Sequence, residues 1–196
     1  MNHRALGTAL AVVVGLALAH PIYGQEYEQA AAMAAYEKAA TPAAPHARLA
    51  EMVGEWQLEV KFWMQPGGEP MVSTATSTRK MIMGGRYLAD HVEGDAMGQS
   101  FTGMGLTGYN NVEERFEATW VDSMGTGIFT YHGEWNEEEN ALVMHGSYVD
   151  PATGKKKMVK TISRIVGPDK EIFEQYEKSE GEEEGLKTME IVSIRK

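Results

Sequence analysis

The sequence predicts an all-β protein, a closed antiparallel up-and-down β-barrel of about ten strands. From Gly54 onward apolar and polar residues alternate with a period of two, as they do in strands that have one face on a core. Turn residues recur about every 8–12 positions, which is typical of sandwiches and barrels. No helical pattern separates the strands, so neighbours along the chain are expected to pair, and closing the sheet would remove its exposed edges.

Residues 1–24 have the pattern of an export signal peptide. Arg4 gives a short basic start, an apolar run follows to Leu18, and small residues allow cleavage after Ala19 or Gly24. The apolar run is shorter than the roughly 20 residues that a membrane span needs. We therefore expect a periplasmic or secreted bacterial protein with no integral membrane span in the mature chain. An uncleaved membrane anchor is the alternative.

Residues 25–45 form a separate Ala-rich segment with high helix propensity. Its apolar stripe is thin, so a partly frayed linker helix is favoured over a helix that docks on a partner. Pro42 and Pro45 end it. A barrel domain is predicted over residues 46–196, and it begins with a short helical turn whose Leu49 and Met52 face the core. That turn is expected to plug one end of the barrel.

The strands of the barrel follow from the period-two pattern and the turns between the apolar runs. Their expected ranges are Gly54–Met64, Met71–Met83, Arg86–Glu93, Phe101–Tyr109, Arg115–Asp122, Gly127–Trp135, Ala141–Val149, Lys156–Val166, Glu171–Lys178 and Leu186–Arg195.

Two hairpins have registers that place apolar residues on one face of both strands. In one, Trp135 lies opposite Leu142 and Tyr131 opposite Gly146. In the other, Tyr109 meets Phe116, Gly105 meets Trp120, and Gly103 meets Asp122. Glycines opposite a large aromatic residue favour an internal cavity over a solid core. The alternative is that Trp120 fills the space that the glycines leave.

Composition excludes several functions. The chain carries 28 acidic and 18 basic residues, a net charge of −10, and would repel nucleic acid. It has no cysteine, which rules out disulfides, thiol catalysis, iron–sulfur clusters and cysteine-type zinc sites. No cofactor is predicted.

Five segments occurring in order resemble the bacterial family catalogued as domain of unknown function 1579, over about residues 46–196. They are Leu49–Trp56, Met81–Leu88, Gly105–Asn110, Thr119–Gly127 and Lys187–Glu190. The resemblance implies a lipocalin-like (calycin-type) barrel. The Gly54-x-Trp56 start is also similar to the opening of lipocalins and fatty-acid-binding proteins, which implies that Arg195 stacks on Trp56 at the closed end.

Other chemical patterns are weak. His132 and His145 are opposite each other but on the polar face, where a solvated pair is favoured over a metal site. The thirteen methionines are scattered, so flexible filler is favoured over copper ligation. The loop from Asp122 to Gly127 is either a tight turn or a carboxylate set near a ligand. No catalytic residues are predicted, because Ser123 has no base in its sequence context.

The predicted function is the binding of a small apolar or amphipathic molecule inside the barrel. Trp120, Phe101, Tyr109, Tyr131 and Met144 are expected to line the cavity, with Asp122 near its mouth. A structural or interaction module of the cell envelope, with a filled barrel and no ligand, is the alternative. An enzyme has the least support.

Overall fold

The computed structural model describes residues 22–65 and 67–196. The chain divides into two compact units, Met1–Glu37 and Lys38–Lys196. Most of the predicted signal peptide (residues 1–24), with the cleavage site after Ala19, falls on residues 1–21, outside the described residues. The other predicted cleavage site, after Gly24, falls within the first helix.

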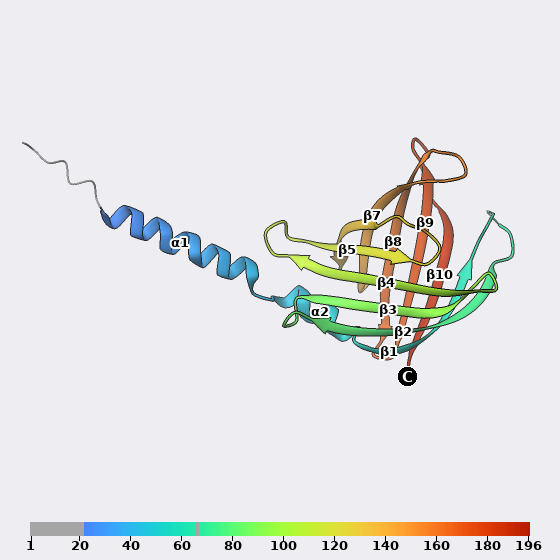
Figure 1. Cartoon of the computed structure of the whole chain (residues 1–196), viewed down its shortest axis with the longest axis horizontal. Coiled ribbons are helices and arrows are strands. Elements are labelled where there is room, and N and C mark those ends of the chain that lie inside the picture. Colours follow the sequence, from blue (N-terminus) through green and yellow to red (C-terminus); the bar gives the residue numbers. More distant parts are fainter. Residues whose placement is uncertain (1–21, 66) are drawn as a thin grey trace, which may run out of the picture. The chain divides into compact units, whose positions relative to one another are not determined.

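The second unit is a closed antiparallel barrel in which each strand pairs with its neighbours along the chain and the first strand pairs with the last (Figure 1). This confirms the predicted ten-stranded meander. The elements are α1 (Ile22–Ala40), α2 (Ala44–Glu51), β1 (Gly54–Phe62), β2 (Met71–Ile82), β3 (Tyr87–Ala96), β4 (Gln99–Asn110), β5 (Arg115–Asp122), β6 (Phe129–Asn136), β7 (Ala141–Val149), β8 (Lys156–Gly167), β9 (Lys170–Ser179) and β10 (Leu186–Arg195).

Both predicted hairpin registers are confirmed. Trp135 lies opposite Leu142 in the β6–β7 pair, and Tyr131 lies opposite Gly146. In the β4–β5 pair, Tyr109 lies opposite Phe116. Because side chains alternate between the two faces of a strand, these registers fix which residues point into the barrel.

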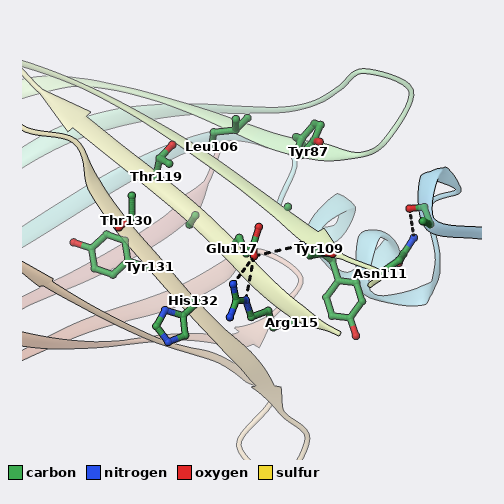
Figure 2. A pocket seen from close by; sticks show the side chains of 14 residues that line it. Tyr87, Leu106, Tyr109, Asn111, Arg115, Glu117, Thr119, Thr130, Tyr131 and His132 are labelled. Atoms are coloured by element: carbon green, nitrogen blue, oxygen red, sulfur yellow. Dashed lines mark hydrogen bonds and ion pairs between the residues drawn. The ribbon is translucent and has the colours of Figure 1, made fainter. Parts of the chain in front are cut away.

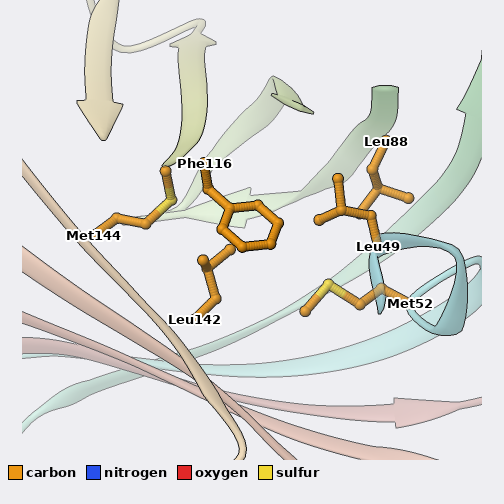
Figure 3. Packing of buried hydrophobic residues seen from close by; sticks show 6 residues of the cluster. All are labelled: Leu49, Met52, Leu88, Phe116, Leu142 and Met144. Carbon is orange, nitrogen blue, oxygen red and sulfur yellow. The ribbon is translucent and has the colours of Figure 1, made fainter. Parts of the chain in front are cut away.

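Helix α2 closes one end of the barrel, as predicted. Pro45 stands in its first turn, where a missing N–H costs nothing, and the His46 ring accepts a 2.9 Å hydrogen bond from the Ala43 amide. Leu49 and Met52 are buried against the inner face of the sheet. Figure 3 shows the ring of Phe116 at the centre of this apolar cluster, whose buried members are Leu49, Met52, Leu88, Phe116, Leu142 and Met144.

The contact that the Gly-x-Trp start implies is present. The Arg195 guanidinium lies 4.1 Å from the Trp56 ring centroid, and the Arg79 guanidinium lies 5.1 Å from it. Arg195 also donates hydrogen bonds to the carbonyl oxygens of Val53, Glu51 and Pro168. These contacts hold the start of β1, the end of β10 and the β8–β9 turn together.

Over residues 27–40, where its side chains are described, helix α1 exposes the large apolar residues Tyr27, Met33 and Tyr36. Within the second unit, the Asn111 side-chain amide donates to the carbonyl oxygens of Lys38, Ala39 and Thr41, at 3.3, 3.1 and 2.8 Å. It thereby satisfies carbonyls that a helix leaves without partners at its C-terminus. Across residues 22–65 and 67–196, neither helix combines the length and apolar character that a membrane crossing needs.

Candidate functional site: the interior of the barrel

The interior of the barrel has two halves that differ in solvent access. In the half that α2 covers, inward-facing residues such as Phe116, Leu142 and Ser77 are buried. In the opposite half, most of the large inward-facing residues remain partly exposed, although the sheet is closed and Val159 of β8 is buried. Those partly exposed residues include Val60, Phe62, Phe101, Trp120, Phe129, Tyr131, Tyr148, Phe173, Gln175, Glu177, Met189 and Ile191. Side chains that filled this half would bury one another, so the second half is open to solvent.

A buried charged cluster in the closed half lies next to this opening. Arg79 on β2 forms ion pairs with Glu171 on β9 and with Asp90 on β3, the latter at 3.2 Å. Ser77 donates to Asp90 at 2.6 Å, and Ser163 donates to Glu171. Burial disfavours the charge of Arg79, but the two carboxylates outweigh it, and the pKa of Arg79 is raised above its usual value. Both interior carboxylates of this half therefore have a cation from the protein itself.

A polar wall in the open half is centred on Glu177 of β9. Its carboxylate accepts hydrogen bonds from the Tyr148 hydroxyl at 2.8 Å, from the Gln175 amide at 2.8 Å and from the Thr188 hydroxyl at 3.3 Å. All three donors are neutral. The wall thus links β7, β9 and β10 and presents a carboxylate whose hydrogen-bond partners bring no positive charge.

The Glu177 carboxylate contributes to raising the pKa of two tyrosines in this half. Burial, followed by the charges of Glu177 and Asp122, raises the pKa of Tyr131 to about 12. Burial and the hydrogen bond to Glu177 also raise the pKa of Tyr148. Tyr131 therefore lies in the field of two carboxylates from different strands, and both phenols keep their protons at neutral pH.

Trp120 and Asp122 lie near the open rim, where β5 ends. The Trp120 indole N–H donates to one oxygen of Asp122 at 2.8 Å, and the Met124 amide donates to the other at 2.9 Å. The loop that follows Asp122 is therefore a turn capped by its own aspartate, while the same carboxylate also orients Trp120. These contacts confirm the tight-turn interpretation of the Asp122–Gly127 loop, while a carboxylate set near a ligand stays a prediction.

The glycines of β4 do not leave a cavity next to Trp120. A β-carbon on Gly103 would lie 2.4 Å from the Trp120 ring, and one on Gly105 would lie 3.3 Å from it. The indole therefore occupies the space above these glycines, which is the alternative that the sequence left open. The inference from glycine spacing to a cavity is wrong at this place, and the case for an open interior depends on the exposed walls instead.

The predicted ligand-lining residues fall into two groups. Phe101, Trp120 and Tyr131 lie on the inner face toward the rim, where Asp122 ends β5. Tyr131 also packs against the buried cluster of the closed half. Phe101 and Trp120 pack against a second buried cluster, whose members are Trp56, Leu58, Ala75 and Val92. The other two residues lie in the closed half. Tyr109 packs edge-on against Phe116, with ring centroids 5.0 Å apart, and Met144 belongs to the same buried cluster.

Sequence reasoning missed the polar half of this lining. Strand β9 alternates Glu171, Phe173, Gln175 and Glu177 on its inner face, and residues just as polar on its outer face, so neither face stands out as apolar. The pairing of Glu177 with Val159, which follows from the β8–β9 turn, would have placed Glu177 inside. The strand register, and not the hydrophobicity pattern, therefore indicates that Glu177 faces the interior.

A second hollow, of about 640 Å³, lies on the outer face of β4–β6 (Figure 2). Its outward-facing lining includes Leu106, Thr119, Thr130 and His132, and Ala39 borders it. Its one arginine, Arg115, already contacts Glu117 at 2.9 Å. The hollow is larger than a crevice between neighbouring side chains, and its lining also includes the inward-facing Tyr109, Ala118 and Tyr131.

His132 and His145 lie opposite each other on the outer face, as predicted, and both are exposed. Partial burial, together with the charges of Lys160 and His132, lowers the pKa of His145. In the part of the chain that the structure describes, no group of three or more histidine, aspartate or glutamate side chains is arranged to hold a metal ion.

Comparison with known proteins places the fold and the family. No curated protein matches the chain. Among solved structures, an S-type phycobiliprotein lyase from Guillardia theta is similar, with 11% sequence identity, a TM-score of 0.52, and coverage of 78% of this chain and 92% of that one. At this identity the likeness supports the lipocalin-like barrel fold and nothing finer. Residues 41–195 match the family described as "Protein of unknown function (DUF1579)". The chain therefore belongs to that family.

Proposed function

We propose that this protein binds a small apolar or amphipathic molecule in the open half of its barrel. The observation that carries the proposal is the partial exposure of aromatic and aliphatic inner side chains, such as Phe173 and Ile191, in a sheet that is otherwise closed. Apolar walls with a few fixed polar groups are the usual chemistry of small-molecule sites. Displacing water from such walls favours binding by about 25 cal/mol for each Å² that becomes buried.

The first test is native mass spectrometry of the protein purified from its own source, with denatured protein as the control. A reproducible extra mass that disappears on denaturation identifies the ligand. Titration with the neutral apolar dye N-phenylnaphthylamine then measures the site without knowledge of the natural ligand.

A matched pair of variants locates the dye. Met189→Trp adds bulk to the inner face of β10, whereas Ile194→Trp adds the same bulk to its exposed outer face. We expect Met189→Trp to abolish dye binding and Ile194→Trp to leave it intact, with circular dichroism confirming that both variants are folded. If the dye does not bind, or if Met189→Trp binds it normally, the proposal is wrong.

A filled barrel that serves as an envelope interaction module is the competing function. The position of Trp120 over Gly103 and Gly105 favours it locally, because the indole takes up the room at that point. A bare mass in the native spectrum, combined with no dye binding, would favour this function over ligand binding.

We also propose that the protein is exported to the periplasm or secreted. The support is the basic start, apolar run and small residues of segment 1–24. The test is the N-terminal sequence of the protein in periplasmic and culture fractions. A mature N-terminus at His20 or Gln25 supports export, and an intact Met1 in the cytoplasmic fraction alone contradicts it.

A further inference from the structure

Among the described residues, the interior of the barrel contains four carboxylates, and two of them are neutralised by a cation. Asp90 and Glu171, in the closed half, both contact Arg79. Asp122 and Glu177, in the open half, form no ion pair within the described residues. Their hydrogen-bond donors are an indole, a phenol, side-chain amides and hydroxyls, and a backbone amide. The open half thus has negative charge that the protein leaves uncompensated.

In residues 22–65 and 67–196, one basic side chain lies on the inner face of this half, and it does not compensate this charge. Lys157 lies opposite Ser179 on β9 and donates to its hydroxyl at 3.0 Å. It also acts on Asp150, in the turn after β7. Lys157 is therefore directed toward the rim, and Glu177 accepts nothing from it.

Aromatic rings surround the uncompensated carboxylates. Tyr148 contacts Glu177 directly, Phe129 packs edge-on against Tyr148 with centroids 5.8 Å apart, and Trp120 contacts Asp122. Aromatic faces attract cations and are indifferent or repulsive to anions. Ring faces and carboxylates therefore both favour a positively charged group on the ligand.

From these contacts we infer that the ligand is an amphipathic cation, a molecule with an ammonium-type or amidinium-type group attached to an apolar body. The charged group would lie beside Tyr131, between Glu177 and Asp122, and would donate to the carboxylate oxygens. The apolar body would lie along Phe173, Ile191 and Val60, which face the same space. Fatty acids and other amphipathic anions would be disfavoured, since their head group would meet like charge with no arginine to receive it. This inference rests on the proposed function.

Three probes with the same twelve-carbon tail test it: dodecylamine, dodecanol and dodecanoate, each displacing N-phenylnaphthylamine from the full chain. We expect dodecylamine to displace the dye at a concentration about tenfold lower than dodecanol does, which is equivalent to about 1.4 kcal/mol of binding free energy. Dodecanoate should be the weakest competitor of the three. The expected order comes from charge alone, because the tails are identical.

Two variants separate the interior from the acidic surface, which would also attract an amine. Glu177→Gln keeps the size of the side chain and removes its charge, and Glu134→Gln does the same on the outer face of β6. We expect the amine preference to disappear in Glu177→Gln and to persist in Glu134→Gln. An equal or better displacement by dodecanoate, or an amine preference that survives Glu177→Gln, overturns the inference while leaving ligand binding intact. Failure of the dye itself to bind overturns the proposed function as well.

Discussion

The two halves of the barrel are built from the same ten strands, but they differ in whether interior carboxylates have a counter-ion and in how tightly the inner side chains pack. In the closed half, Leu49 of α2 and Met52, which follows the helix, join an apolar cluster, and Arg79 neutralises both interior carboxylates. In the open half, the inner walls keep contact with solvent, and Glu177 receives only neutral donors. Burying a charge without a counter-ion is costly, so the closed half cannot hold an unpaired carboxylate, whereas the open half can, because water reaches it. The comparison assigns stability to one half and binding to the other.

The sharpest test of this division compares two phenylalanines. Phe116 in the closed half is 2% exposed, whereas Phe173 in the open half is partly exposed. We expect Phe116→Ala to lower the free energy of unfolding by about 4 kcal/mol. Phe173→Ala should lower it by about 1 kcal/mol, because less area is removed from water. Urea unfolding measures both, and equal losses would mean that the open half is packed as tightly as the closed one.

The buried ion cluster should show the next largest effect. Arg79→Met leaves the buried Glu171 and the half-buried Asp90 without a cation and is expected to cost about 3 kcal/mol. Lys61→Met removes a cation from the outer face, where it contacts Glu59 and Glu190 in solvent, and should leave the urea midpoint nearly unchanged. A small effect of Arg79→Met would show that the interior carboxylates take up protons readily, and the contrast between the halves would then be lost.

A third test concerns the space around Trp120. Gly103→Ala places a methyl group against the indole ring and is expected to cost about 2 kcal/mol, since the ring must leave its position. Gly127→Ala, where nothing lies within 4 Å of the added carbon, is the control and should not destabilise the protein. A neutral Gly103→Ala would mean that Trp120 already moves freely, and that the rim of the open half is wider than its contacts indicate.

A fourth test, which is confined to alkaline pH, concerns the titration of Tyr131. Its pKa is raised from 10.0 to about 12 by burial and by two carboxylates, so the folded protein keeps this proton at a pH where the unfolded chain loses it. The free energy of unfolding should therefore decrease as the pH rises from about 10 to about 12. Tyrosinate absorbance should contain a component near pH 12 that Tyr131→Phe removes and that urea-unfolded protein lacks. Its persistence in Tyr131→Phe would assign it to another tyrosine.

The elements that the sequence predicts best are those with a local signal. The ranges Arg115–Asp122, Ala141–Val149 and Leu186–Arg195 match the observed strands β5, β7 and β10 at both ends. The stacking of Arg195 on Trp56 followed from a resemblance that connects the two ends of the barrel. Turn residues and period-two alternation suffice for such elements, because both depend on neighbours in the chain.

The candidate site was harder to predict because its contacts cross the interior. Arg79 and Glu171 are 92 residues apart and lie on strands that are not neighbours in the sheet, so the local sequence around either residue does not predict their ion pair. Glu177 is polar on a strand that is polar on both faces, and hydrophobicity could not place it inside. The glycines opposite Trp120 favoured a cavity, but in the structure they accommodate the indole ring.

The clamp formed by Arg195 also bears on the order of folding. Its partner Val53 is 142 residues earlier in the chain, and β1 completes its pairing only when β10 is present. Closing so long a segment costs entropy that only the final contacts can offset, so ring closure should be a late and slow event. Until the last strand has been synthesised, β1 and β9 each have an unpaired edge, and a chain shortened by a few residues at that end should aggregate rather than fold.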